Sequence, residues 1–151
     1  MSDSPNILIV AATFYKDIAD EMLAGARDVL ESAKASFDII EVPGAFEIPS
    51  AIAFAHKAGI DGTHKAYDGY VALGCVIRGE TSHYDYVCGE SARGLMNLAL
   101  DHHIALVNGI LTVENQDQAM ARAQRNQKNK GGDVTSALLD MLALKQKFGL
   151  S

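Results

Sequence analysis

One short stretch of the chain combines residue types that bind an anion and move a proton. Residues 78–83 read RGETSH and follow an apolar run, where a buried strand gives way to a helix. Gly79 lets a ligand approach the backbone, and the amides that open a helix attract anions because they are unpaired and lie at the positive end of the helix dipole. Histidine is the residue type suited to proton transfer at neutral pH, and His83 falls in the first helical turn. The stretch predicts an anion site with His83 as proton-transfer group, although a capped helix with a surface histidine explains the same residues.

Three further loops carry side chains that suit a small aromatic ligand, and each follows an apolar run of strand length. The first holds Phe14 between Thr13 and Tyr15. The second, residues 43–49 (PGAFEIP), places an aromatic and a carboxylate between two prolines, and the third group begins at Asn108. Because ligands of open parallel sheets bind at the carboxyl ends of the strands, we expect these loops to share one edge with residues 78–83. On sequence alone, Phe14 and the phenylalanine of the second loop are equally well explained as core side chains.

The cysteines and the remaining histidines form no pattern of a metal or redox site. Cys75 and Cys88 lie thirteen positions apart without a second pair, which fits neither a zinc ligand set nor a redox Cys-x-x-Cys. We interpret both as small, buried side chains in reducing cytosol. No glycine-rich dinucleotide motif and no P-loop occurs in the sequence. We therefore expect no metal and no organic cofactor.

Apolar runs that alternate with amphipathic stretches predict the elements that position these loops. Strand signals fall at residues 6–12, 37–42, 70–77 and 104–111. Helix signals fall at residues 17–34, 49–59, 84–103, 116–125 and 133–148, with Ser82 as the expected N-cap of the third helix. Strands that alternate with helices favour right-handed crossovers and helices on both sheet faces. The predicted fold is an α/β, three-layer α/β/α sandwich with a central four-stranded parallel sheet, of the flavodoxin-like class.

Length and charge limit the class of protein. At 151 residues without repeat or linker, we expect one domain over residues 1–151, with a flexible N-terminus at residues 1–5. No apolar run approaches 18 residues and no signal-peptide pattern occurs, so we expect a cytoplasmic protein without membrane contact. Thirteen basic against nineteen acidic side chains give a net charge of -6, which disfavours nucleic acid as a partner. A phosphorylated substrate would need a local anion site.

Four segments resemble signature sequences of the 6,7-dimethyl-8-ribityllumazine synthase family. They are VPGAFEIP at 42–49, LGCVIRGETSHYDYVC at 73–88, NGILTVEN at 108–115 and NKGGD at 129–133. The resemblance covers residues 6–148 in the same order and with matching spacing. It implies a transferase of riboflavin biosynthesis with two small-molecule substrates. This enzyme condenses 5-amino-6-(D-ribitylamino)uracil with 3,4-dihydroxy-2-butanone 4-phosphate, giving 6,7-dimethyl-8-ribityllumazine, phosphate and water.

The resemblance also implies a role for each site residue. His83 corresponds to the proton donor, and Phe14 to the aromatic side chain that stacks on the pyrimidine. The segment that holds the ribityl chain corresponds to Ala45, Phe46 and Glu47. The backbone that forms hydrogen bonds with the pyrimidine edge corresponds to Cys75, Val76 and Ile77. The phosphate-binding amides correspond to those of Glu80 and Thr81. The groups that a neighbouring subunit contributes to the site correspond to Asn108, Arg122 and Lys130. Of these, Arg122 faces the phosphate. The resemblance thus implies a homo-oligomer with sites between adjacent subunits.

Departures from the family pattern bear on ligand contacts and assembly. Thr13 and Tyr15 stand where many members have arginine and asparagine, and Asn108 stands where many have phenylalanine. Residues 123–129 contain no glycine, whereas shell-forming members often have glycines there, and the N-terminal arm is short. These departures favour a homopentamer, or paired pentamers, over a 60-subunit shell.

Two other functions are compatible with the sequence. An archaeal-type riboflavin synthase shares the fold, but its reaction has no phosphorylated substrate, which disfavours it given the intact loop at residues 78–81. The other alternative is a lumazine- or flavin-binding relative with weak or no activity, which the presence of His83 and Arg122 disfavours.

Overall fold

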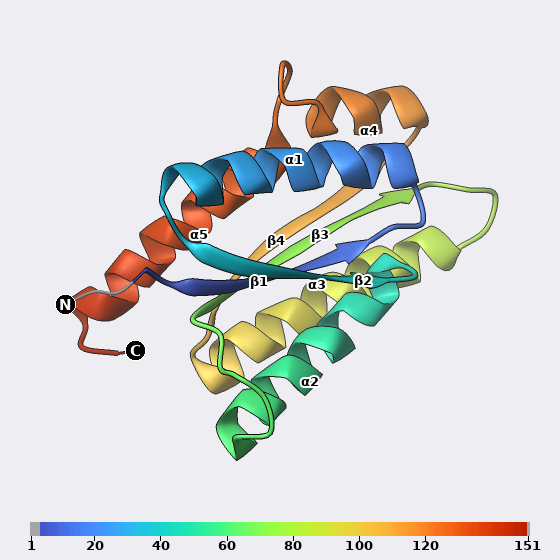
Figure 1. The fold of residues 1–151 in the computed structure, drawn as a ribbon. Coiled ribbons are helices and arrows are strands. Elements are labelled where there is room, and N and C mark those ends of the chain that lie inside the picture. Colours follow the sequence, from blue (N-terminus) through green and yellow to red (C-terminus); the bar gives the residue numbers. More distant parts are fainter. Residues whose placement is uncertain (1–3, 151) are drawn as a thin grey trace.

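The computed structural model describes residues 4–150, which form a four-stranded parallel sheet between two layers of helices (Figure 1). The strands are β1 (Asn6–Ala12), β2 (Ser36–Val42), β3 (Gly69–Ile77) and β4 (Ala105–Val113). All three strand pairings are parallel, and the order across the sheet is β2-β1-β3-β4. The predicted α/β/α sandwich is confirmed. The N-terminus predicted to be flexible lies partly outside the described residues, which begin at Ser4.

The helices divide between the two faces of the sheet. α1 (Lys16–Ser32), α4 (Gln116–Ala123) and α5 (Lys130–Lys147) cover one face, and α2 (Ile48–Asp61) and α3 (His83–His102) cover the other (Figure 1). α5 begins three residues earlier than predicted. Asn129, in the left-handed region with φ 47°, caps it by accepting a hydrogen bond from the amide of Gly132 at 3.3 Å. No helix among residues 4–150 is long and apolar enough to span a bilayer.

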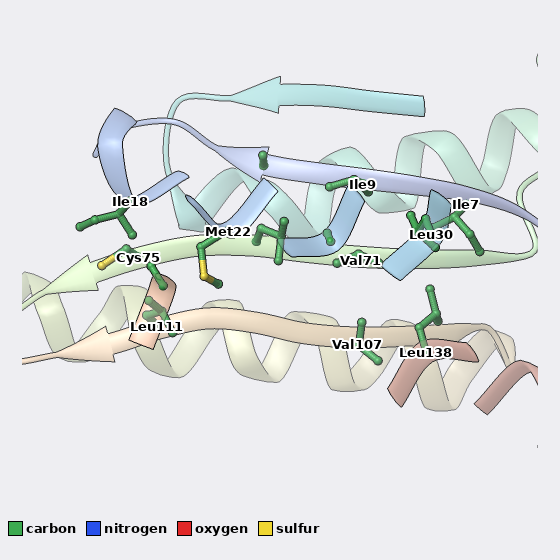
Figure 2. Close-up of a cluster of buried hydrophobic side chains, with 14 of the residues drawn as sticks. Ile7, Ile9, Ile18, Met22, Leu30, Val71, Cys75, Val107, Leu111 and Leu138 are labelled. Carbon is green, nitrogen blue, oxygen red and sulfur yellow. The ribbon is translucent and has the colours of Figure 1, made fainter. Parts of the chain in front are cut away.

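Alternation along the central strands builds a separate core on each face. Successive strand side chains point to opposite faces, so Ile7 and Ile9 of β1 face one helical layer while Leu8 and Val10 face the other. Figure 2 shows the first cluster, in which Met22 of α1 lies on the same side of the sheet as Ile9. Both faces of β1 are fully covered, which explains its continuous apolar sequence.

Close packing of α1 against α5 depends on Gly131. A Cβ atom at this position would overlap the carbonyl oxygen of Met22 and lie 2.8 Å from its carbonyl carbon. Both atoms belong to the backbone of α1, so no side-chain rotation relieves the contact. The two helices therefore approach as closely as they do because residue 131 has no side chain.

The order of the strands places a topological switch point between β1 and β3. From β1 the chain moves outward to β2, and it then crosses back to β3 and continues to β4 on the other side. The loops that follow β1 and β3 therefore leave the sheet in opposite directions and open a crevice at the carboxyl edge.

Candidate functional site

A cavity of about 400 Å³ opens at this switch point, between the loops that follow β1, β2 and β3 and the first turn of α3. Most of the predicted site residues line it: Phe14, Ala45, Phe46, Glu47, Cys75, Val76, Ile77, Thr81 and His83. Glu80 lies between Gly79 and Thr81, which both line the wall, without contributing to the wall itself. The sheet thus brings together predicted residues that are up to 69 positions apart, from Phe14 to His83.

The two phenylalanine rings at the cavity are not core side chains, so that alternative interpretation is wrong. Phe14 is 74% exposed and Phe46 is 53% exposed. The Phe14 ring meets Tyr15 edge to face, with centroids 4.9 Å apart and an interplanar angle of 87°. Large exposed aromatic rings that line a cavity can contact a flat ligand, because part of their apolar surface is still in water.

The turn after β2 is held against the sheet by Ala45. Pro43 ends the strand, and residues Ala45–Glu47 form a single 3-10 turn before α2 begins at Ile48. Ala45 is buried, whereas Glu47 is exposed at the cavity. Gly74 of β3 lies beside this turn: a Cβ atom there would make a tight contact of 3.3 Å with Ala12 Cβ and an ordinary contact of 3.7 Å with Ala45 Cβ.

The loop before α3 leaves its amides unpaired. None of the amides of residues 79–82 donates a hydrogen bond to another group within residues 4–150. Ser82 is the N-cap residue, as predicted, but its side chain accepts no capping hydrogen bond. Instead, Thr81 Oγ1 accepts a hydrogen bond from the amide of His83 at 3.3 Å. Free amides next to a helix N-terminus provide what an anion requires.

Arg78 lies beside this loop, and its side chain contacts three residues. Its Nε donates to both carboxylate oxygens of Glu114, at 3.1 Å each, and its Nη1 lies 3.6 Å from Asp85 Oδ1. The guanidinium also stacks over the ring of Tyr84, 4.2 Å from the ring centroid. The hydrogen bond to Glu114 raises the pKa of Arg78 above its ordinary value, so the side chain stays charged.

Cys75 is an inert part of the wall. It is 8% exposed, and burial, followed by the nearby Cys88 thiol, raises its pKa to about 11. A thiol with this pKa is protonated at neutral pH and is a poor nucleophile. The interpretation of Cys75 as a small, buried side chain is confirmed, and Cys88, which is also a free thiol, is half-buried.

Besides Glu80, three predicted residues do not line the cavity of their own chain. Asn108 lies on the edge strand β4 and accepts a hydrogen bond from the amide of Ile110 at 2.9 Å. Arg122 lies in the last turn of α4, where Nη1 donates to the carbonyl oxygen of Gln118 at 2.9 Å. Lys130 is the first residue of α5. Sequence reasoning assigned these side chains to the site of a neighbouring subunit, and that assignment stays a prediction.

Several lining residues were missing from the predicted set: Tyr15, Gly44, Gly79, Tyr84 and Val87. A signal for Val87 was present, because residue 87 follows His83 at the i+4 position. The i+4 position lies on the same helical face as residue i. Burial, followed by the nearby Cys75, raises the pKa of Tyr15 above its ordinary value, which keeps its hydroxyl a hydrogen-bond donor at neutral pH.

A larger cavity, of about 760 Å³, lies at the opposite edge of the sheet and has a different character. Its walls include His56, His102 and Lys145, which are close to the C-terminal ends of α2, α3 and α5. Lys145 lies in the last turn of α5, where its positive charge complements the negative end of the helix dipole, whereas α2 has no basic side chain in its last turn. Within residues 4–150 no group of three or more His, Cys, Asp or Glu suited to a metal ion occurs.

The fold and the first cavity define a class, that of doubly wound α/β proteins with a small-molecule site at the switch point of the sheet. Comparison with known proteins then identifies the family. The family model described as 6,7-dimethyl-8-ribityllumazine synthase matches residues 4–146, and the chain belongs to this family.

Similar proteins of the same name span nearly the whole chain. One from Bartonella tribocorum is 54% identical over 149 residues, covering 99% of this chain and 95% of that protein. One from Bartonella bacilliformis is 57% identical, covering 97% of this chain and 93% of that protein. "6,7-dimethyl-8-ribityllumazine synthase 1" of Rhizobium meliloti is 57% identical, covering 95% and 94%.

Proposed function

We propose that the chain condenses 5-amino-6-(D-ribitylamino)uracil with 3,4-dihydroxy-2-butanone 4-phosphate to give 6,7-dimethyl-8-ribityllumazine, phosphate and water. The observation that supports this function is the composition of the cavity at the switch point. An exposed aromatic ring, Phe14, the end of β3, a loop of free amides and His83 meet there, in a member of this family. The reaction joins an aromatic amine to a ketone, expels phosphate and closes a ring.

Each part of the cavity has a place in this reaction. The ring of Phe14 stacks on the pyrimidine, and the backbone of Cys75, Val76 and Ile77 forms hydrogen bonds with the pyrimidine edge. Ala45, Phe46 and Glu47 hold the ribityl chain. Imine formation, loss of phosphate and ring closure all require proton transfers, and the exposed imidazole of His83 supplies them. Much of the rate acceleration comes from holding two substrates together, which is worth several kcal/mol.

The phosphate binds at the loop before α3. The amides near Glu80 and Thr81 have no acceptor within the described chain, and a phosphate oxygen provides one. The chain as a whole has a net charge of -6, so this local site must overcome a repulsive field. In this proposal Arg122 of an adjacent subunit contributes a charge-assisted hydrogen bond to the same phosphate.

The proposal includes a homopentamer of one-domain subunits in the cytoplasm, with each site shared by two subunits. Exposed apolar side chains on α2 and α3 support assembly: Phe54 is 73% exposed, Met96 58% and Leu100 65%. Large exposed apolar side chains on two neighbouring helices favour an interface. The positions of Asn108 and Arg122 outside the cavity of their own chain also support a shared site. No metal and no organic cofactor takes part in the proposed reaction.

The direct test is to mix the purified protein with both substrates and to follow lumazine absorbance together with phosphate release. We expect the two signals to rise in equal amounts. Conversion of added lumazine to riboflavin would instead support a riboflavin synthase, and tight lumazine binding without turnover would support a binding relative.

A subunit-mixing experiment tests the shared site. His83→Ala and Arg122→Ala each impair every site, and the second change should weaken the phosphorylated substrate roughly ten- to a hundredfold. If both variants are unfolded together and reassembled in equal amounts, about one site in four of a closed ring regains both groups. Activity should then approach about a quarter of the wild-type value. Mixed rings no more active than the average of the two variants would place both residues in one chain's site.

A further inference from the structure

We propose that Arg78 is a positioning residue, which holds the anion loop of residues 79–82 and the first turn of α3 in the arrangement that the cavity uses. Its contacts span the ends of two strands and the start of one helix. The backbone of Arg78 extends β3 by one residue, since its amide donates to the carbonyl oxygen of Val113 in β4 at 2.9 Å. Its side chain reaches Glu114, just beyond β4, and Tyr84 and Asp85 in the first turn of α3.

The same contacts explain why Arg78 is not itself the phosphate ligand. Its guanidinium donates to both oxygens of Glu114 and lies near a second carboxylate, Asp85. A phosphate would have to compete with two negative charges that are already in place. Arg78 also does not line the cavity, whereas Gly79 and Thr81 do. Its effect on a bound anion must therefore pass through the loop that it holds.

The loop needs such support because its own backbone provides little. The amides of residues 79–82 form no hydrogen bond with other groups of the described chain, so no ladder or turn bond fixes their direction. Arg78 stands at one end of the loop, and its stacking on Tyr84 fixes the other end, beside His83. With both ends held, the amides and His83 are oriented before a ligand arrives. Such preorganisation matters for rate, because a misplacement of about 1 Å can cost about a hundredfold.

The side chains of Arg78 and its two acidic partners are exposed, which indicates that these contacts position the loop and add little to the stability of the fold. The side chains of Arg78, Glu114 and Asp85 are 43%, 57% and 63% exposed. Ion pairs this exposed contribute little to folding and are weakened by salt. Loss of Arg78 should therefore leave the melting temperature nearly unchanged while it disturbs the site. Lysine should not replace Arg78, because an ammonium group lacks the planar face that lies over Tyr84 and the separate Nε and Nη1 groups that face Glu114 and Asp85.

The test compares Arg78→Ala, Arg78→Lys, Glu114→Ala and the double variant Arg78→Ala/Glu114→Ala with wild type. Arg93→Ala is the matched control, because Arg93 also forms an exposed ion pair, with Glu90 at 2.6 Å on the same helix, but does not line the cavity. The kinetic part rests on the proposed function. Arg78→Ala should raise KM for the phosphorylated substrate and lower kcat, each about tenfold, with KM for the pyrimidine within about twofold of wild type.

The double variant should be no worse than Arg78→Ala alone, because both changes remove the same contact. Arg78→Lys should resemble Arg78→Ala, and Arg93→Ala should behave as wild type. Wild-type kinetics in Arg78→Ala, or equal losses for both substrates accompanied by a large fall in melting temperature, would overturn the proposal.

A second measurement does not depend on activity. Hydrogen exchange of the Asp85 and Tyr86 amides, which donate to the carbonyl oxygen of Ser82 at 3.0 and 3.4 Å, should become faster in Arg78→Ala and stay unchanged in Arg93→Ala, because the loop and the first turn of α3 lose their anchor only in the first variant. Unchanged exchange in Arg78→Ala would overturn the inference even if the protein is an active synthase. If exchange becomes faster in Arg78→Ala but the wild-type protein shows no turnover, Arg78 is still the anchor of the loop, and the proposed function is refuted instead.

Discussion

Replacement of Phe14 by alanine separates ligand binding from folding. The ring is 74% exposed, so its removal uncovers little apolar surface, and the main loss within the chain is the edge contact with Tyr15. An aromatic pair of this kind is worth about 0.5–1.5 kcal/mol, and exposure places this one at the low end. Stacking of a base on an aromatic ring is worth about 1–3 kcal/mol, so Phe14→Ala should weaken lumazine binding about five- to 150-fold.

The assay is fluorescence titration with 6,7-dimethyl-8-ribityllumazine, accompanied by urea unfolding at one fixed protein concentration. Phe148→Ala is a matched control, because Phe148 is 73% exposed at the end of α5 and does not line the cavity. The control should bind the ligand as wild type does. Equal affinities for the two variants would refute the stacking role, and a loss of more than about 2 kcal/mol of stability in Phe14→Ala would show that the ring is structural.

Further predictions concern catalysis, packing and pH. His83→Ala should lower turnover about tenfold to a few hundredfold with little change in ligand affinity, and steady-state kinetics that match wild type across neutral pH would refute the proton-transfer role. Gly131→Ala should lower the free energy of unfolding, measured with urea, by about 2–3 kcal/mol or more, because the new Cβ overlaps the backbone of Met22. Gly89→Ala should instead raise the free energy of unfolding by about 0.5–1 kcal/mol, because Gly89 is exposed on α3 with open space around it. Burial first, and then His102 and Lys145, hold the pKa of His56 below its ordinary value of 6.5. The unfolded chain then binds more protons at acid pH, so stability should fall as the pH drops through 6.5, and His56→Gln should reduce that fall.

The sequence by itself determined the layers of the fold and the chemistry of the loops. Strands and helices alternate in the order that requires a parallel sheet, and the apolar run of β1 and β3 corresponds to strands covered on both faces. The carboxyl ends of such strands share one edge, so the meeting of Phe14, Phe46 and His83 at one cavity followed from connectivity alone. These features depend on local periodicity and on rules of chain topology, which a single sequence carries.

Contacts between distant residues were decided only by the tertiary structure. Whether Phe14 and Phe46 are core or surface depends on what packs over the loops, which no local pattern encodes, and the structure leaves both rings exposed. The Arg78–Glu114 pair joins residues 36 positions apart, and its geometry follows from the register of β3 against β4. Ser82 has the right type and position for a cap, but its backbone is in the αR region (φ -73°, ψ -1°) instead of the extended region typical of N-caps, and Thr81 Oγ1 accepts the hydrogen bond from the His83 amide. Spacing determines which residues reach the same edge, and packing determines which of them touch.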